Sequence, residues 1–205
     1  MFSNKFIEIK DGEAAALLDK INEQIEGQKL DTASVKILST DLDYYPSCSF
    51  IEVSSGDPLD KRQISLLQNN QVNEVHILNG TNEPIYKLNA ELPIQLNKEN
   101  VCAYARFFFS FVSGRHGRFL IIDNPDDIDW REEPAPNAKK ALGKMIEPLR
   151  VSSEDSESFT LKSSIIFKDS LFEADVIVKK DGQITLTRQE ILVEDIPVLD
   201  DVFGQ

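Results

Sequence analysis

The chain has 205 residues, of which 41% are hydrophobic and 28% are charged, and its formal net charge is −13. A chain of this length buries roughly 70% of its unfolded surface, so it needs neither a metal nor a disulfide to fold. The composition excludes disorder over the whole chain. Because the negative charge is spread over both halves, we expect no nucleic-acid partner and no membrane association.

The two cysteines, Cys48 and Cys102, stand in neither a CxxC nor a Cys/His ligand spacing, so the sequence predicts no thiol-bound metal. The first residues lack the apolar core of a signal peptide. The longest apolar run, 107–112, is too short to span a bilayer. We therefore expect a cytoplasmic protein in which both thiols are reduced.

The first 96 residues predict an α/β portion that begins with an amphipathic helix. A short strand at 6–9 leads to a helix over 13–26, with Asp11 as its N-cap and Gly27 as its C-terminal stop. The apolar residues of this helix recur at helical spacings, at positions 17, 18, 21 and 25. Such a pattern is typical of a helix that lies on the surface of a domain.

Further along this portion the patterns predict strands and one short helix. Strands are expected at 35–38, 48–53, 72–78 and 85–88. The last of them would return after the turn signal Asn79-Gly80. Asp57-Pro58 resembles an N-cap followed by proline in the first turn, so a helix is expected from there to Gln68.

Residues 98–113 form the clearest predicted element, a helix with Asn97 as its N-cap and Gly114 as its C-terminal stop. Its apolar side chains, rich in phenylalanine, cover an arc of roughly 220° around the helix axis. A surface helix needs an apolar arc of little more than about 100°. We therefore predict that this helix is covered on two or three sides and forms the core of the protein.

The residues after this helix predict a strand, a second helix and a β-meander. In chain order we expect a strand at 118–122, an acidic loop at 123–136, a helix at 138–147 and a polar connector at 150–158. Apolar and polar residues then alternate in 159–167 and 172–178, and again after Asp181-Gly182, a strong hairpin signal. This period of two predicts an antiparallel sheet with one face on the core.

Together these elements predict an α+β fold in which an antiparallel sheet, the C-terminal meander, packs on a central apolar helix at 98–113. An N-terminal α/β portion precedes it. We expect two domains, 1–96 and 97–205, with one continuous fold as the alternative. In element order alone, the second part resembles the cystatin-like and nuclear-transport-factor-like cone folds. This resemblance implies a pocket between the helix and the meander.

The local excess of positive charge lies just after the central helix, at Arg115, His116 and Arg118. Arg106 precedes it on the same helix, and two arginines can bind a carboxylate or phosphate in a bidentate manner. The predicted ligand-binding residues are therefore Tyr104, Arg106, Arg115, His116 and Arg118. The alternative is that these cations pair with acidic side chains and with the helix C-terminus.

The sequence predicts no metal site. The aspartates within 123–129 lack the glycine and the ligand spacing of an EF-hand, so a solvated turn is favoured over a calcium site. His76 lies in the strand predicted at 72–78 and is expected to face solvent, and two isolated histidines cannot form a three-histidine zinc site. A Cys102–His116 dyad is excluded because about 20 Å of helix separates them.

No serine-nucleophile motif and no phosphate-binding loop occurs, so the sequence predicts no cofactor. It favours a non-catalytic interaction or binding protein whose partner is another protein or a second copy of the chain. One alternative is a small-molecule-binding or enzymatic cone with a pocket between helix 98–113 and the meander. Another is an acidic inhibitor or immunity-type protein. The tail, 190–205, is expected to be a final strand with a frayed end, or a docking segment.

Overall fold

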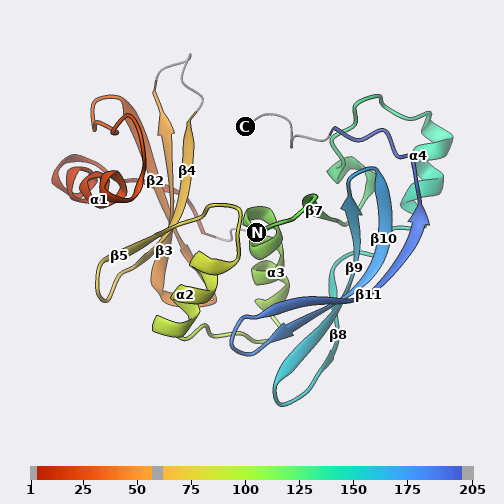
Figure 1. Cartoon of the computed structure of the whole chain (residues 1–205). Helices are drawn as coiled ribbons and strands as arrows, with labels where there is room; N and C mark the ends of the chain where they lie inside the picture. The colour runs from red at the N-terminus through yellow and green to blue at the C-terminus, as the bar shows by residue number, and fades with distance from the viewer. Residues whose placement is uncertain (1–3, 57–61, 200–205) are drawn as a thin grey trace. The chain divides into compact units, whose positions relative to one another are not determined.

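Two antiparallel sheets, one in each of two units, organise the chain (Figure 1). The computed structural model describes residues 4–56 and 62–199. Unit 1 comprises Met1–Gln95 and unit 2 comprises Leu96–Gln205. This architecture confirms the predicted α+β class. Independent folding of the two predicted domains, 1–96 and 97–205, stays a prediction.

Unit 1 builds a sheet from five strands in the order β1-β2-β3-β4-β5. Its elements are β1 (Ile7–Glu8), α1 (Asp11–Gln24), β2 (Val35–Leu42), β3 (Tyr45–Ser55), β4 (Gln63–Asn69), β5 (Glu74–Ile77) and α2 (Glu83–Glu91). Helix α1 packs on one face of this sheet, because Leu17 and Ile21 are buried in the same apolar cluster as Ile37, Leu66 and Val75. The amphipathic helix that the sequence predicts is therefore present.

The helix predicted to end at Gln68 is wrong, because residues 63–69 form strand β4, which pairs with β3. Leu66 and Leu67 are both buried, so this strand is covered on both faces. Two adjacent buried residues interrupt the alternation of apolar and polar residues by which a half-buried strand is recognised. The predicted start of that helix, Asp57-Pro58, lies outside the described residues.

The strand predicted at 85–88 is also wrong, because helix α2 occupies these residues. Pro84 stands in the first turn of the helix, where its missing N–H costs no hydrogen bond. Ile85 and Leu88 are three residues apart, and both are buried, as expected for one face of a helix. A segment of four residues is too short for its apolar pattern to distinguish a strand from a single helical turn.

Unit 2 builds a second antiparallel sheet in the order β11-β10-β9-β7-β6, and β8 pairs with β9 beside this path. Its elements are α3 (Val101–Phe111), β6 (Ser113–Gly114), β7 (Gly117–Ile122), the short 3-10 helix η1 (Pro125–Asp127), α4 (Pro136–Gly143), β8 (Arg150–Glu154), β9 (Ser158–Phe167), β10 (Ser170–Lys179) and β11 (Ile184–Val193). The predicted meander is confirmed as β9, β10 and β11. The connector predicted at 150–158 is wrong, since β8 pairs with β9 although its side chains are mostly exposed.

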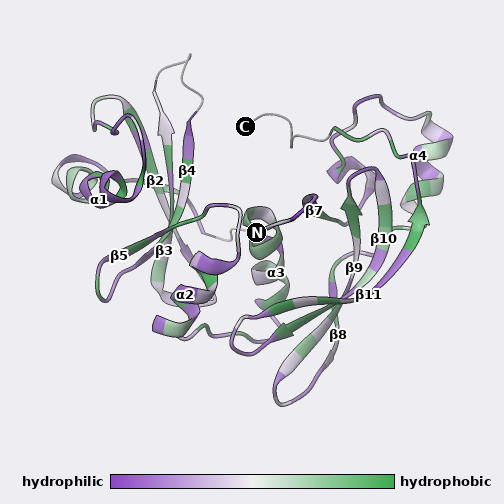
Figure 2. Cartoon of the chain, viewed as in Figure 1, coloured by the Kyte–Doolittle hydropathy of each residue, from purple (hydrophilic) through white to green (hydrophobic). Residues whose placement is uncertain are grey.

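Helix α3 is the predicted central helix, shortened at both ends to Val101–Phe111. It is largely apolar (Figure 2), and its buried residues are Val101, Tyr104, Ala105, Phe107, Phe108 and Phe109. Asn100 rather than Asn97 is the N-cap, because the Asn97 side chain accepts hydrogen bonds from the N–H groups of Glu99 and Asn100 and closes a preceding turn. Among the described residues, no helix combines the length and the apolar character that a membrane span needs.

Aromatic contacts join α3 to the sheet of unit 2. The Phe109 ring meets the Phe119 ring of β7 edge to face, with centroids 6.0 Å apart. Phe119 in turn stacks on Phe167 of β9, with centroids 4.6 Å apart. The predicted packing of the meander sheet on the central helix is thus present.

Candidate functional site

Two of the side chains predicted to bind a ligand beside α3, Tyr104 and Arg106, form hydrogen bonds within unit 2. The Tyr104 side chain is fully buried, and its hydroxyl donates a 2.5 Å hydrogen bond to the carbonyl oxygen of Gly182. Arg106 donates from Nη2 to Asp123 Oδ1 at 2.6 Å. These two residues therefore have structural contacts, and a role for either in ligand binding stays a prediction.

The Arg106–Asp123 pair is supported by the backbone. The N–H of Leu149 donates to Asp123 Oδ1 at 3.0 Å. Burial acts to raise the pKa of Asp123, but the hydrogen bonds from Arg106 and from the Leu149 backbone together lower it below its ordinary value. The pair thus links α3 to the segments that follow β7 and precede β8.

Neither cysteine has the character of an activated nucleophile. Burial raises the pKa of the Cys48 thiol to about 12. Burial also raises the pKa of the Cys102 thiol. A reactive cysteine needs the opposite shift, which keeps it as a thiolate near neutral pH.

The other predicted residues, Arg115, His116 and Arg118, lie in the β6–β7 hairpin and are exposed. Two glycines let this hairpin approach the aromatic rings of the sheet. A Cβ atom on Gly114 would lie 2.7 Å from the Phe119 ring, and Gly117 has a φ of +150°, which disfavours other residues. The basic hairpin is therefore fixed beside those rings.

An apolar surface, which we call the aromatic patch, lies on the sheet of unit 2 next to this hairpin. It consists of Phe119, Phe167, Phe172, Leu186 and Ile191. In the strand register Phe119 pairs with Phe167, Phe172 with Ile191, and Val176 with Leu186. Directly opposed residues share a face of a sheet, and the alternation along β9 and β10 places all three pairs on the same face.

The aromatic patch is partly exposed to solvent, and the residues that it covers are buried. Its three rings and Leu186 are half-buried, and Ile191 is 52% exposed. The residues beneath, Ile165 and Ala174, are buried. The hollow that most of the patch residues and these two buried residues line has a volume of only about 20 Å³, which is too small for a metabolite. The patch therefore suits a protruding side chain better than an enclosed ligand.

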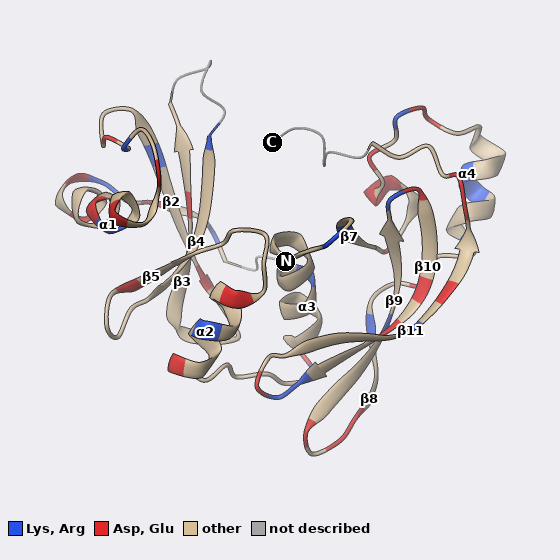
Figure 3. Cartoon of the chain, in the orientation of Figure 1, with Lys and Arg blue, Asp and Glu red and all other residues tan. Residues whose placement is uncertain are grey.

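Positive charge surrounds one side of the aromatic patch. The Lys168 ammonium lies 5.8 Å from the centroid of the Phe167 ring, within range of a cation–π contact. Figure 3 shows basic residues in blue at the start of β7 and at the end of β9, where Arg118 and Lys168 lie. The Arg118 side chain, however, lies on the other face of the sheet, because it alternates with Phe119 along β7 and lines a separate small hollow with Leu120 and Ile166. We call Arg115, His116 and Lys168 the basic rim.

Strand β11 forms the free edge of the sheet beside the patch. It spans ten residues and pairs only with β10 among the described strands. Two irregularities interrupt this pairing, between Leu171 and Phe172 and between Asp175 and Val176. Such bulges are common at edges, where they discourage uncontrolled strand addition. A further strand is therefore expected to pair poorly with the backbone of β11.

The acidic loop and the tail have structural contacts in unit 2. The Asp127 carboxylate accepts hydrogen bonds from the backbone N–H groups of Asp123 and Asn124, which is the turn role that the sequence favours. Trp130 pairs with Val198 in a β-bridge, and Val198 is buried in an apolar cluster of this unit. The tail up to residue 199 thus packs on its own unit, and 200–205 lie outside the described residues.

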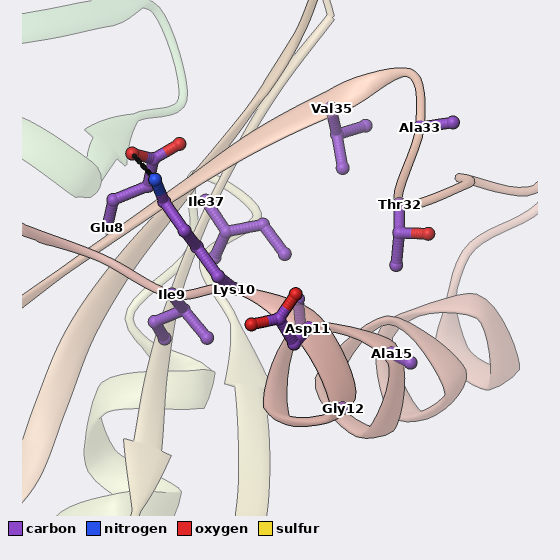
Figure 4. Close-up of a pocket in the computed structure, with 11 residues that line it drawn as sticks. Glu8, Ile9, Lys10, Asp11, Gly12, Ala15, Thr32, Ala33, Val35 and Ile37 are labelled. Carbon is purple, nitrogen blue, oxygen red and sulfur yellow. Dashed lines mark ion pairs between the residues drawn. The ribbon is translucent and has the colours of Figure 1, made fainter.

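Unit 1 holds a hollow of about 700 Å³ between β2 and the start of α1 (Figure 4). The Lys10 ammonium at its rim is paired with the Glu8 carboxylate at 3.1 Å. Asp11 and Glu13 stand in the first turn of α1, and their charge opposes the anion that a helix N-terminus would attract. Apart from Thr32, the rest of its lining consists of glycine, alanine and aliphatic residues, so it offers few further polar groups to a ligand.

The prediction that His76 faces solvent is wrong, because this residue is only 4% exposed. It lies with Glu74 and Glu91 in a cluster of possible metal-ligand atoms. The sequence contains a signal for it, namely an acid and a histidine two residues apart on one strand. The sequence does not reveal the third member, Glu91, because its pattern favours a strand at 85–88 instead of the helix that carries this residue.

Comparison with known proteins gives no further guide to the site. We found no significant match between the chain and any protein-family model, curated protein or solved structure.

Proposed function

We propose that this chain is a non-catalytic protein-interaction module and that the aromatic patch, with its basic rim, is its binding surface. The observation that carries this proposal is the half-exposed cluster of three phenylalanines at the open end of the sheet in unit 2. Contiguous apolar surface beside polar residues is typical of sites where a partner binds. Aromatic side chains supply much of the binding energy at such sites.

The charge around the patch indicates the chemistry of the partner. The protein carries a net charge of −13, yet the side chains next to the patch are basic. Among the described residues, Arg115 and Lys168 take part in no ion pair. A peptide segment with apolar side chains flanked by aspartate or glutamate would bury its apolar groups on the rings and place its acids at the rim.

Two features favour this binding role over an enzymatic cone. Tyr104 and Arg106, the residues expected to reach a ligand, already contact Gly182 and Asp123. The cysteine thiols have raised pKa values, and the sequence carries no other nucleophile motif. An inhibitor that presents its acidic surface to a basic partner is a weaker candidate, since the apolar surface of this chain is bordered by cations.

Selection from a library of random peptides displayed on phage tests the proposal. The expected result is enrichment of peptides that combine phenylalanine or leucine with acidic residues. Their affinity, measured by fluorescence anisotropy with labelled peptides, should fall at least about tenfold in Phe172→Gln, since a buried aromatic anchor contributes more than about 1.4 kcal/mol. Lys168→Glu should also weaken binding, and the difference in affinity between this variant and the unsubstituted protein should become smaller at high salt.

Matched variants away from the patch control for changes in charge and surface hydrophobicity. Val72 is 66% exposed in unit 1 and Lys140 is exposed in α4, so Val72→Gln and Lys140→Glu should leave the affinity unchanged. Circular dichroism confirms that each variant is folded. Enrichment of basic peptides, or equal binding by Phe172→Gln and the unsubstituted protein, would rule out this surface.

A further inference from the structure

Three potential ligand side chains meet at the edge of the sheet in unit 1. Glu74 and His76 are two residues apart on β5, so they lie on the same face of that strand. Glu91 ends helix α2, which contacts β5. One ligand atom from each of the three residues lies within 4.8 Å of the other two.

His76 is the member of this cluster that points to a bound group. Its side chain is only 3% exposed, and its Nε2 atom has no hydrogen-bond partner. Nε2 does lie 3.2 Å from Glu91 Oε2, but the contact is not aligned as an N–H···O hydrogen bond. Buried polar atoms in proteins are nearly always satisfied, so an unsatisfied imidazole nitrogen calls for an explanation.

The separation of these two atoms fits two ligands of one metal ion. Ligand atoms each about 2.1 Å from an ion lie about 3.0–3.4 Å apart at octahedral or tetrahedral angles. The observed separation of Nε2 and Oε2 is 3.2 Å. A small movement of the Glu74 side chain, which is 45% exposed, would bring the third ligand into the same range.

We propose that Glu74, His76 and Glu91 bind one divalent transition-metal ion, with Zn²⁺ as the best fit. One imidazole nitrogen and two carboxylates form a mixed donor set that suits Zn²⁺, whereas Mg²⁺ and Ca²⁺ prefer oxygen ligands alone. A hollow of about 450 Å³ opens beside Glu74 and His76, so water can complete the coordination. This site lies in unit 1 and is independent of the aromatic patch.

Lys87 competes with a metal ion for the same carboxylates. Its ammonium lies 2.9 Å from Glu74 Oε1 and 3.7 Å from Glu91 Oε1. Without a metal, this ammonium supplies the positive charge that the two carboxylates need. The Lys87 side chain is 56% exposed, so it can turn into solvent when an ion binds. Removing its charge should therefore strengthen metal binding.

Isothermal titration of the full chain with ZnCl₂, in buffer with excess Mg²⁺ to occupy weak carboxylate sites, tests the proposal. The expected result is one Zn²⁺ per chain. The affinity should fall at least about tenfold in His76→Gln, because losing a ligand costs no less than losing a residue that supports one. Glu91→Gln should weaken binding to a similar degree, and Lys87→Met should strengthen it.

His116 provides the matched control, since it is exposed and is the other histidine of the chain. His116→Gln should bind Zn²⁺ as the unsubstituted protein does. Circular dichroism checks the fold of each variant, and Glu91→Gln keeps the test decisive if His76→Gln does not fold. Equal affinities in His76→Gln and His116→Gln, or the absence of a stoichiometric ion in the unsubstituted protein, would overturn the proposal.

Discussion

The hydroxyl of Tyr104 donates a hydrogen bond to the carbonyl oxygen of Gly182, a residue 78 positions further along the chain. Gly182 forms the turn between β10 and β11, and its φ of +84° lies in the left-handed region that favours glycine. The bond therefore connects the central helix to the far end of the meander. It also occupies the one polar group that α3 places deep in the core of unit 2.

Replacing Tyr104 by phenylalanine removes this hydrogen bond and leaves the ring in place. The Gly182 carbonyl then loses a buried donor, so we expect the free energy of unfolding to fall by about 1–2 kcal/mol. Urea denaturation followed by circular dichroism measures the change. A Tyr104→Phe variant as stable as the unsubstituted protein would show that the bond contributes nothing.

The Arg106–Asp123 pair should make stability depend on acid. The folded state lowers the pKa of Asp123, so the contribution of this carboxylate is present above its unfolded pKa of about 3.9 and is lost as pH falls through the folded value. We expect Asp123→Asn to destabilise the protein at pH 7 by about 1 kcal/mol, a modest value because the pair is partly exposed. In urea denaturation the difference should vanish near pH 2. A constant difference at both pH values would contradict this role.

His76 should make stability depend on pH in a higher range. Burial lowers the pKa of His76 in the folded state, despite the neighbouring carboxylates, so the unfolded chain takes up the proton first as pH falls. Stability is therefore complete above about pH 7 and declines below the unfolded histidine pKa of about 6.5. In the presence of a chelator, the urea concentration at the denaturation midpoint should decrease as the pH is lowered from 8 to 5.5. His76→Gln should reduce this decline, and His116→Gln should leave it unchanged.

The central helix should tolerate truncation at its end better than at its middle. Phe107 is fully buried, so Phe107→Ala should cost about 3–5 kcal/mol. Phe111, whose ring lies 4.9 Å from that of Phe107, is only half-buried, so Phe111→Ala should cost about 1–2 kcal/mol. Thermal denaturation ranks the two variants. The reverse order would contradict the greater burial of Phe107.

The sequence patterns could predict α3 and the meander because their periodicities are strong. Phenylalanines around most of one helix and alternating residues in β10 each have a single structural solution. Strand β4 could not be predicted because Leu66 and Leu67 are buried on opposite faces of the strand. Strand β8 could not be predicted because a mostly exposed strand needs no apolar pattern. In both cases the pairing partner, rather than the local pattern, determines the structure.

The candidate sites depended still more on contacts between distant residues. Arg115, His116 and Arg118 are identifiable in the sequence as a basic cluster, but the position of their hairpin beside the aromatic patch follows from the pairing of β7 with β9. The metal cluster required β5 and α2 to meet, and residues 74 and 91 are too far apart in sequence for any local pattern to join them. Register and tertiary packing, not composition, bring these side chains together.

Amide hydrogen exchange with and without a selected peptide tests most directly that the aromatic patch is the binding surface. We expect slower exchange in the β6–β7 hairpin, around the β9–β10 turn and in β11 when peptide is bound, and unchanged exchange in unit 1. Slowed exchange confined to unit 1, for example around the hollow at the start of α1, would contradict it.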